Sequence, residues 1–268
     1  MALEKNRNRR TYFNHPLVVE SLQCLPAALT YRTAEEFRGY VIGHVPQNSL
    51  KGRQRIAGYL LQRFSQNGRL NLPLAAAIAQ FGDSRISREI LLFELLRVYP
   101  VLVEIATHWL AELPETGGCR DSLKDFLAAR IPGRSTEKVA KDALTTLTQC
   151  GKVSRLKIGW YTAVWSRPPI EVFLYVLAAL YPKPAVVPVA VFAGQAILRA
   201  LLWPPSCIEE LLFEAERAGH ISKISQLDQY HQFTVAGSGR ERMERLFPNV
   251  LLAAEQSMLF DLQPEVER

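Results

Sequence analysis

Apolar side chains recur at helical spacing near the start of the chain, and capping residues mark where helices begin. Thr33 and Glu36 have the spacing of a capping box, in which each side chain accepts a hydrogen bond from a free amide of the first turn. The apolar positions that follow are Phe37, Tyr40 and Val41. Pro46 ends this predicted helix. Ser49 can cap the next one, whose apolar stripe consists of Ile56, Tyr59, Leu60 and Phe64.

A longer apolar pattern follows these two helices. A short helix is predicted from Leu74 to Phe81, and residues 87–113 are apolar on nearly all sides. A helix of that kind is typical of a core position, and Pro100 should kink or split it. We therefore expect residues 1–113 to form an N-terminal helical bundle that carries a basic arm, residues 1–13.

The pattern changes after the linker at residues 114–118. Two helices are predicted at 122–130 and 136–150, with Ser135 as the cap of the second. Strands at 152–158 and 160–165 follow, with Gly159 as the turn between them. Helix, turn, helix and two-stranded ribbon is the order of a winged helix-turn-helix, predicted here at residues 119–168.

The same order occurs a second time. Residues 150–156 (CGKVSRL) align with residues 218–224 (AGHISKI), and a helix is predicted just before, at 206–218. We therefore expect a second winged helix at residues 171–236 and a C-terminal helix and tail at 237–268. The predicted fold is mainly α, a helical bundle followed by two winged helix-turn-helix modules with short two-stranded β-wings.

Composition narrows the class of protein. Hydrophobic residues make up 48% and charged residues 22% of the 268 residues, which is typical of a globular protein. The four cysteines form no CxxC pair and match no zinc pattern, so reduced thiols, no metal and a cytoplasmic location are expected. The most apolar region, residues 172–202, is interrupted by Lys183, Arg199 and three prolines, which argues against a membrane span.

Sequence signatures of catalysis are missing. The chain has no P-loop, GxGxxG, HExxH or GxSxG motif, and its five histidines are scattered. We therefore predict a protein that is not an enzyme and needs no cofactor. A site assembled from distant segments is the alternative that sequence motifs do not reveal.

The net charge of +6 is unevenly distributed. Residues 1–70 carry +7 and residues 121–170 carry +5, whereas residues 71–120, 171–236 and 237–268 carry −2 each. Clustered Lys and Arg side chains neutralise phosphates and release counterions from nucleic acid. This distribution favours double-stranded DNA as the partner. The alternative is a basic surface that serves only solubility.

The first winged helix supplies most of the candidate DNA contacts. If Val139, Ala143, Leu147 and Cys150 form the core side of the helix at 136–150, three side chains share its outer face. Those are Lys138, Lys141 and Thr145. The start of the helix adds Arg134, Ser135 and Thr136, which suit phosphate contact, and the ribbon adds Lys152, Arg155 and Lys157. Strand alternation places Lys152 on one face of the ribbon and the other two on the opposite face.

The helix that begins after Ser49 is a second candidate surface. Its cations are Lys51, Arg53, Arg55 and Arg63. Lys51 and Arg55 lie opposite the apolar stripe, Arg53 lies near the first turn, and Arg63 lies at the edge of the stripe. Together with the arm at Arg7–Arg10 they could clamp a duplex from another side. A solubilising helix face is the alternative.

The second winged helix is acidic. Its helix at 206–218 carries Glu209, Glu210, Glu214 and Glu216, which phosphate would repel. A structural or protein-binding role is therefore expected for this module.

The N-terminal pattern resembles a known family. The run Thr33–Arg38, the helix start Ser49–Lys51 and the positions Arg55–Ile56, Leu60 and Arg63–Phe64 are similar to the BrxA family of accessory proteins in BREX bacteriophage-exclusion systems. The resemblance covers about residues 15–165 and leaves the C-terminal module outside. It implies a mostly helical, non-enzymatic, DNA-binding component of a phage-defence locus, with duplex contacts on the basic helix and the winged helix.

Two functions remain open from the sequence. The first is an accessory protein of a bacterial phage-defence system that binds double-stranded DNA mainly through phosphates. The second is a scaffold that docks a larger methyltransferase or ATPase of the same operon through the second winged helix and Trp203–Pro205. The two functions are compatible with each other.

Overall fold

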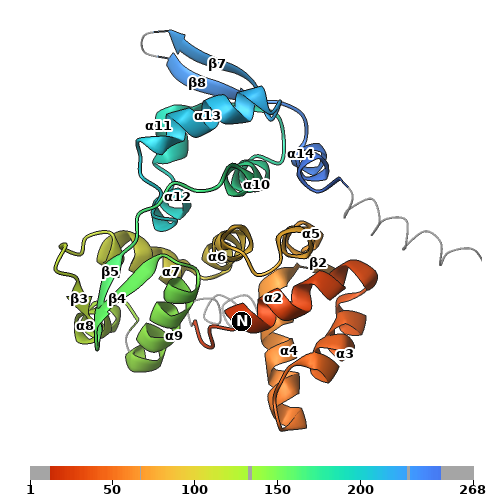
Figure 1. Cartoon of the computed structure of the whole chain (residues 1–268), viewed down its shortest axis with the longest axis vertical. Coiled ribbons are helices and arrows are strands. Elements are labelled where there is room, and N and C mark those ends of the chain that lie inside the picture. Colours follow the sequence, from red (N-terminus) through yellow and green to blue (C-terminus); the bar gives the residue numbers. More distant parts are fainter. Residues whose placement is uncertain (1–12, 67, 132–134, 228–229, 249–268) are drawn as a thin grey trace, which may run out of the picture.

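The protein is mainly α-helical with small antiparallel sheets (Figure 1). The structure is a computed structural model that describes residues 13–66, 68–131, 135–227 and 230–248. Residues 1–12 of the predicted basic arm (1–13) and the tail beyond residue 248 lie outside these ranges. The described helices include none long and apolar enough to cross a membrane.

Helices fill the N-terminal region as predicted. The first elements are α2 (Val18–Cys24), η1 (Leu25–Thr30), α3 (Ala34–His44) and α4 (Leu50–Phe64). The capping box at the start of α3 is present, because the amide of Glu36 donates to Thr33 Oγ1 over 3.2 Å and Glu36 Oε2 accepts from the amide of Thr33. Ser49 caps α4 by accepting from the amide of Gly52. A small hairpin of β1 (Ser65–Gln66) and β2 (Arg69–Leu70), which the sequence pattern did not predict, follows α4.

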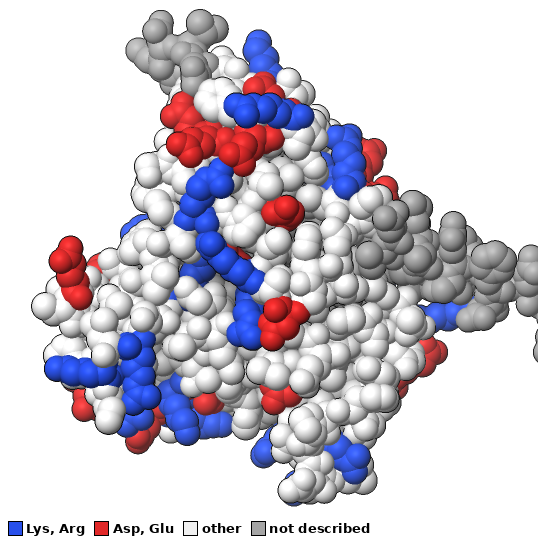
Figure 2. All heavy atoms as spheres, viewed as in Figure 1, with Lys and Arg blue, Asp and Glu red and all other residues white. Residues whose placement is uncertain are grey.

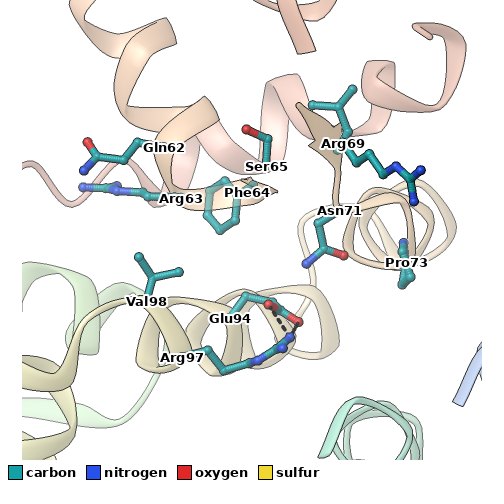
Figure 3. A pocket seen from close by; sticks show the side chains of 11 residues that line it. Gln62, Arg63, Phe64, Ser65, Arg69, Asn71, Pro73, Glu94, Arg97 and Val98 are labelled. Atoms are coloured by element: carbon teal, nitrogen blue, oxygen red, sulfur yellow. Dashed lines mark hydrogen bonds and ion pairs between the residues drawn. The ribbon is translucent and has the colours of Figure 1, made fainter. Parts of the chain in front are cut away.

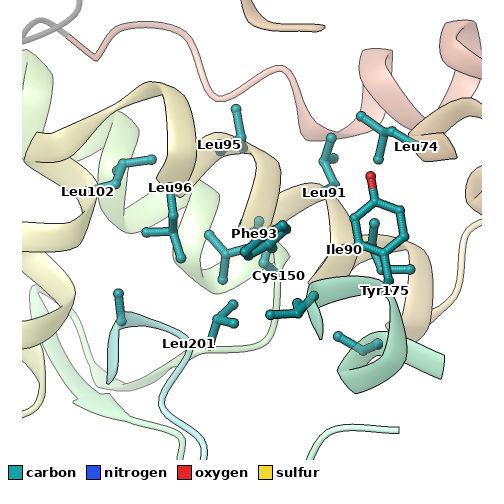
Figure 4. Close-up of a cluster of buried hydrophobic side chains, with 14 of the residues drawn as sticks. Leu74, Ile90, Leu91, Phe93, Leu95, Leu96, Leu102, Cys150, Tyr175 and Leu201 are labelled. Carbon is teal, nitrogen blue, oxygen red and sulfur yellow. The ribbon is translucent and has the colours of Figure 1, made fainter. Parts of the chain in front are cut away.

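A buried helix lies at the centre of the molecule. The next elements are α5 (Leu72–Phe81), α6 (Arg85–Val98), α7 (Pro100–Ile105) and the π-helical turn η2 (Ala106–Leu110). The split at Pro100 is confirmed, since proline has no amide to continue the hydrogen bonds of α6. Helix α6 packs against α2, α4, α5, α9, α10 and α12. Figure 4 shows its side chains Ile90, Leu91, Phe93, Leu95 and Leu96 among apolar neighbours from these elements.

The region after the linker contains two helices and a hairpin at the predicted places. Its elements are β3 (Gly118–Cys119), α8 (Arg120–Ala128), α9 (Thr136–Gln149), β4 (Val153–Lys157) and β5 (Trp160–Ala163). The sheet has three strands rather than two, in the order β3-β5-β4 and all antiparallel. The extra strand β3 is two residues long and lies at the end of the predicted linker.

The C-terminal region repeats this arrangement. Its elements are α10 (Ile170–Leu180), β6 (Ala185–Pro188), α11 (Val189–Ala193), α12 (Ala196–Ala200), α13 (Cys207–Arg217), β7 (Ile221–Leu227), β8 (Tyr230–Val235) and α14 (Gly239–Leu246). The strand order β6-β8-β7 again places the last strand in the middle. The helix predicted at 206–218, before the repeated motif, corresponds to α13. Strand β6 was missed, and the described part of the predicted C-terminal helix is α14.

One hydrophobic core runs through all of these parts. It extends from Phe13 to Phe247 and includes residues of α4, α6, α9, α10 and α13. Because the regions share this core, the surfaces of the N-terminal helices and of α9 are held in a fixed relation to each other.

Candidate nucleic-acid interface

Helix α9 presents its predicted basic face. Val139, Ala143, Leu147 and Cys150 are all buried, as the helical pattern predicts. Lys141 on the opposite side is exposed. Lys138 has 40% of its side chain exposed and lies 3.8 Å from the carboxylate of Asp142.

The start of α9 differs in part from the prediction. Ser135 is the N-cap residue, as predicted, but its side chain makes no capping hydrogen bond. Its exposed side chain and the half-buried Thr136 border the first turn. The hydroxyl of Thr145 donates to the carbonyl of Lys141 within the helix. Arg134 lies outside the described residues.

Helix α4 exposes two of its four predicted cations and leaves a third partly accessible. Lys51 and Arg55 are exposed and Arg53 is half-buried. Within the ranges that the structure describes, Lys51, Arg55 and Lys141 form no ion pair. An unpaired surface cation is available to a phosphate without first losing an intramolecular partner.

His15 joins the two basic helices. Its ring lies 5.0 Å from the ring of Tyr59 on α4, measured between centroids. Its Nε2 lies 3.5 Å from Lys138 Nζ on α9, and its backbone amide donates to Asp142 Oδ2 over 2.8 Å. In Figure 1 the N-terminal segment accordingly passes between α9 and α4.

The electrostatics of His15 show that cations from both helices act at this point. Partial burial lowers the pKa of His15, and the charges of Lys138, Arg55 and Arg63 lower it further, against the opposing effect of Asp142. Lys138 and Arg55 come from the two basic blocks of the sequence, 83 residues apart. The fold therefore brings the two blocks together.

Sequence reasoning missed His15. A single histidine carries no local signal, and its partners lie more than 40 residues away in α4 and more than 120 away in α9. Only the tertiary structure reveals this junction.

Arg63 does not belong to the interface, which corrects the prediction. It is 4% exposed, and its guanidinium donates to the backbone carbonyls of Asn14 and His15, each over 2.6 Å. It also donates to the carbonyl of Pro16 over 3.2 Å and to the hydroxyl of Tyr99 over 3.1 Å. The side chain at the edge of the apolar stripe thus turns inward and holds the segment that carries His15.

Lys152 is also buried, which corrects a second prediction. It is 1% exposed, and its ammonium pairs with the equally buried Glu89 of α6. The indole Nε1 of Trp203 donates to the same Glu89 oxygen over 2.7 Å. Burial lowers the pKa of Lys152, while the Glu89 carboxylate acts in the opposite direction. Lys152 directly precedes β4, which begins at Val153. Because its ammonium is buried against Glu89, this lysine anchors the hairpin to α6 and is not part of the hairpin's surface.

The hairpin itself keeps two exposed cations, Arg155 and Lys157. Lys157 Nζ lies 4.5 Å from the centre of the Trp160 ring, a cation–π contact. The pairing of β4 with β5 shifts between Arg155 and Lys157, so the simple alternation assumed for the ribbon does not hold there.

Charged side chains are unevenly distributed over the face shown in Figure 2. Lys and Arg gather over the end that carries β4, β5 and α9 in Figure 1, with some Asp and Glu among them, and a large group of Asp and Glu lies over α13 at the other end, beside further Lys and Arg. Several α13 carboxylates are paired. Glu214 and Glu210 lie 2.5 and 3.8 Å from Arg167, and Glu209 lies 3.5 Å from His231.

A cavity of about 730 Å³ lies between α4, β2 and α6. Its lining includes Arg69, Asn71, Glu94 and Arg97 (Figure 3). The carboxylate of Glu94 is already bound by Arg97 over 3.1 Å and accepts from the hydroxyl of Tyr175 over 2.9 Å. The only acid in this lining is therefore satisfied, and the cavity pairs no nucleophile with a base.

Comparison with known proteins provides a fold but no family. Neither a protein-family model nor a curated protein matches the chain. The structure is similar to a solved structure titled "SspB crystal structure", with a TM-score of 0.53 and 12% sequence identity over 95% of this chain and 96% of that chain. At such low identity the likeness concerns the fold alone.

Proposed function

We propose that the protein binds double-stranded DNA along a surface formed by α4, the His15 junction, α9 and the β4–β5 hairpin. The observation that carries this proposal is the junction itself, where the ring of His15 lies 5.0 Å from the ring of Tyr59 on α4 and 3.5 Å from Lys138 Nζ on α9. Two cationic helices held at one point give a phosphate backbone several contacts at once. The cations that would make them are Lys51, Arg53, Arg55, Lys138, Lys141, Arg155 and Lys157.

The proposal includes a winged-helix interpretation of both sheet regions. In each, a helix precedes the first strand, further helices follow, and a hairpin ends the unit with its last strand in the middle of the sheet. In such a unit the last helix before the hairpin faces the major groove and the hairpin follows the backbone. These elements are α9 and β4–β5 in the basic unit. In the acidic unit they are α13 and β7–β8, which we do not assign to DNA.

Binding is proposed to depend mainly on phosphates. The candidate side chains are lysines and arginines, with Ser135, Thr136 and Thr145 beside them, and such groups position a duplex without reading its sequence. The resemblance to the BrxA family supplies the setting of this proposal, an accessory role in bacterial phage defence.

Charge reversal tests the proposal. Lys138→Glu with Lys141→Glu should weaken binding to a random duplex by at least about 100-fold at low salt, since two phosphate contacts are lost and repulsion is added. Lys183→Glu with Arg199→Glu is the matched control, with the same change in net charge at exposed positions outside the proposed surface. Equal loss in both variants, or none in the first, would contradict the assignment of α9.

A second function is favoured by an apolar site in the C-terminal half. Trp165 is 46% exposed and borders a cavity of about 120 Å³ lined also by Trp203, Pro205 and Ile208. Trp203 is itself buried, at 4% exposed. An exposed aromatic side chain such as Trp165 beside this depression suits a protein partner. We propose that a larger protein of the same locus, such as a methyltransferase or ATPase, docks there. Its co-purification should survive nuclease treatment and be lost in Trp165→Ala.

A further inference from the structure

The turn of the β4–β5 hairpin carries an unusual side chain. Ile158 is 87% exposed, more than any other large apolar residue in the described ranges, and Leu156 beside it is 50% exposed. Short hairpin turns favour Gly, Asn and Asp, and Gly159 with φ of 76° meets that need. Ile158 contributes little to the core, so neither turn geometry nor packing accounts for it.

The surroundings of Ile158 are cationic. Residues 151–166 contain no Asp or Glu, and the exposed Arg155 and Lys157 stand on the same hairpin. One carboxylate, Asp121, lines the same depression as Ile158, and it lies 2.7 Å from Lys124 Nζ. An apolar tip on a hairpin whose charged side chains are all cations matches a polyanion with an apolar interior, which is what a base-paired duplex presents.

The tip is continuous with the basic surface of α9. The carbonyl of Gly159 accepts from the amide of Arg120 over 2.9 Å, and the Arg120 guanidinium lies 3.7 Å from Glu137 in the first turn of α9. Lys141 lies one turn further along that helix. The hairpin turn and the start of α9 are therefore linked through Arg120.

We propose that Ile158, supported by Leu156, is an apolar wedge that enters a base step of the bound duplex and bends it. This inference rests on the proposed DNA binding and adds a bend to it. Apolar side chains inserted between base pairs partly unstack them and kink DNA by about 20–90°. Arg155 and Lys157 would neutralise phosphates beside the opened step, which lowers the repulsion that resists bending.

Resonance energy transfer across an end-labelled duplex of about 20 bp tests the wedge, with binding followed by anisotropy on the same samples. The full chain should bind and raise the transfer efficiency. Ile158→Ser should still bind, weaker by less than about 10-fold, but leave the transfer efficiency unchanged. Ile158→Leu keeps an apolar tip and should bend the duplex. Val191→Ser, at a 59% exposed valine of α11, is the matched control and should behave like the unmodified protein.

The outcomes separate the wedge from DNA binding itself. Binding without a change in transfer efficiency, or equal bending by Ile158→Ser, overturns the wedge and leaves the proposed function standing. Lack of binding to any duplex overturns both. Sedimentation with phosphatidylserine vesicles that depends on Ile158, in a protein that does not bend DNA, would show that the tip serves a membrane surface and would also overturn the wedge.

Discussion

The segment that carries His15 depends on Arg63, and this dependence predicts a large loss of stability when the guanidinium is removed. In Arg63→Met the aliphatic stem remains while the hydrogen bonds to three backbone carbonyls and one hydroxyl are lost. Contacts of the guanidinium with the rings of Phe13 and Tyr99, at 5.3 and 5.4 Å, disappear as well.

The magnitude follows from these contacts. Each hydrogen bond to a charged donor contributes about 1.5–3 kcal/mol, but the carbonyls of this partly buried segment can be rehydrated once it loosens. We therefore expect the free energy of unfolding to fall by about 2–4 kcal/mol, less than the sum of the bonds. Arg63→Lys should recover only a small part, because one ammonium cannot serve three carbonyls in the geometry of a guanidinium fork.

Equilibrium urea denaturation measures this loss, and Arg55→Met is the matched control. Arg55 is exposed and forms no ion pair in the part of the chain that the structure describes, so its replacement should change stability by less than about 0.5 kcal/mol. For DNA affinity we expect the opposite order. Arg55→Met should have the larger direct effect on affinity, because Arg55 is the residue proposed to contact phosphate. A loss below about 0.5 kcal/mol for Arg63→Met would refute the conclusion that Arg63 holds the segment that carries His15.

Three further predictions concern buried and titrating groups. Lys152→Met should lower the free energy of unfolding by about 3–5 kcal/mol in chemical denaturation, because Glu89 is left charged and buried. Adding Glu89→Gln should restore part of this loss. If the losses of the two single variants simply add in the double variant, the two side chains are not coupled. Burial lowers the pKa of His220 to about 4, so at a pH below about 6.5 the unfolded chain binds a proton that the folded protein does not. The free energy of unfolding should therefore drop by up to about 3 kcal/mol between about pH 6.5 and about pH 4. His220→Gln should reduce this dependence of stability on pH. Phosphates near His15 should raise its pKa, so DNA affinity should increase as the pH falls from about 8 to about 5.5, an increase that His15→Asn should abolish in anisotropy titrations.

Local signals made much of the fold predictable. The capping box of α3, the serine cap of α4 and the split at Pro100 each act within a few residues, and the structure contains all three. Helices α8 and α9 and the β4–β5 hairpin were likewise predicted, because their periodicity is visible in the sequence.

Short strands escaped prediction for a physical reason. Strand β3 has two residues, and β6 is flanked by Pro184 and ends at Pro188, so neither shows an alternating pattern. Each forms only because β5 or β8 offers a free edge. Such pairing depends on the tertiary structure.

The candidate surface was predictable only in part. Residue type and helical phase were enough to place Lys51, Arg55 and Lys141 in solvent. They could not show that Arg63 and Lys152 have buried acceptors, because those acceptors come from residues 14–16 and from Glu89, distant in sequence. Nor could they show that His15 joins the two basic helices.

The salt dependence of duplex binding tests the central claim most directly. If the surface neutralises about five to seven phosphates, the logarithm of the association constant should fall against the logarithm of salt concentration with a slope of about −4.5 to −6. Lys138→Glu with Lys141→Glu should make that slope shallower by about 2, while Lys183→Glu with Arg199→Glu should leave it unchanged. Affinity that does not vary with salt, or no binding to any duplex at low salt, would contradict the claim that this is a DNA-binding surface.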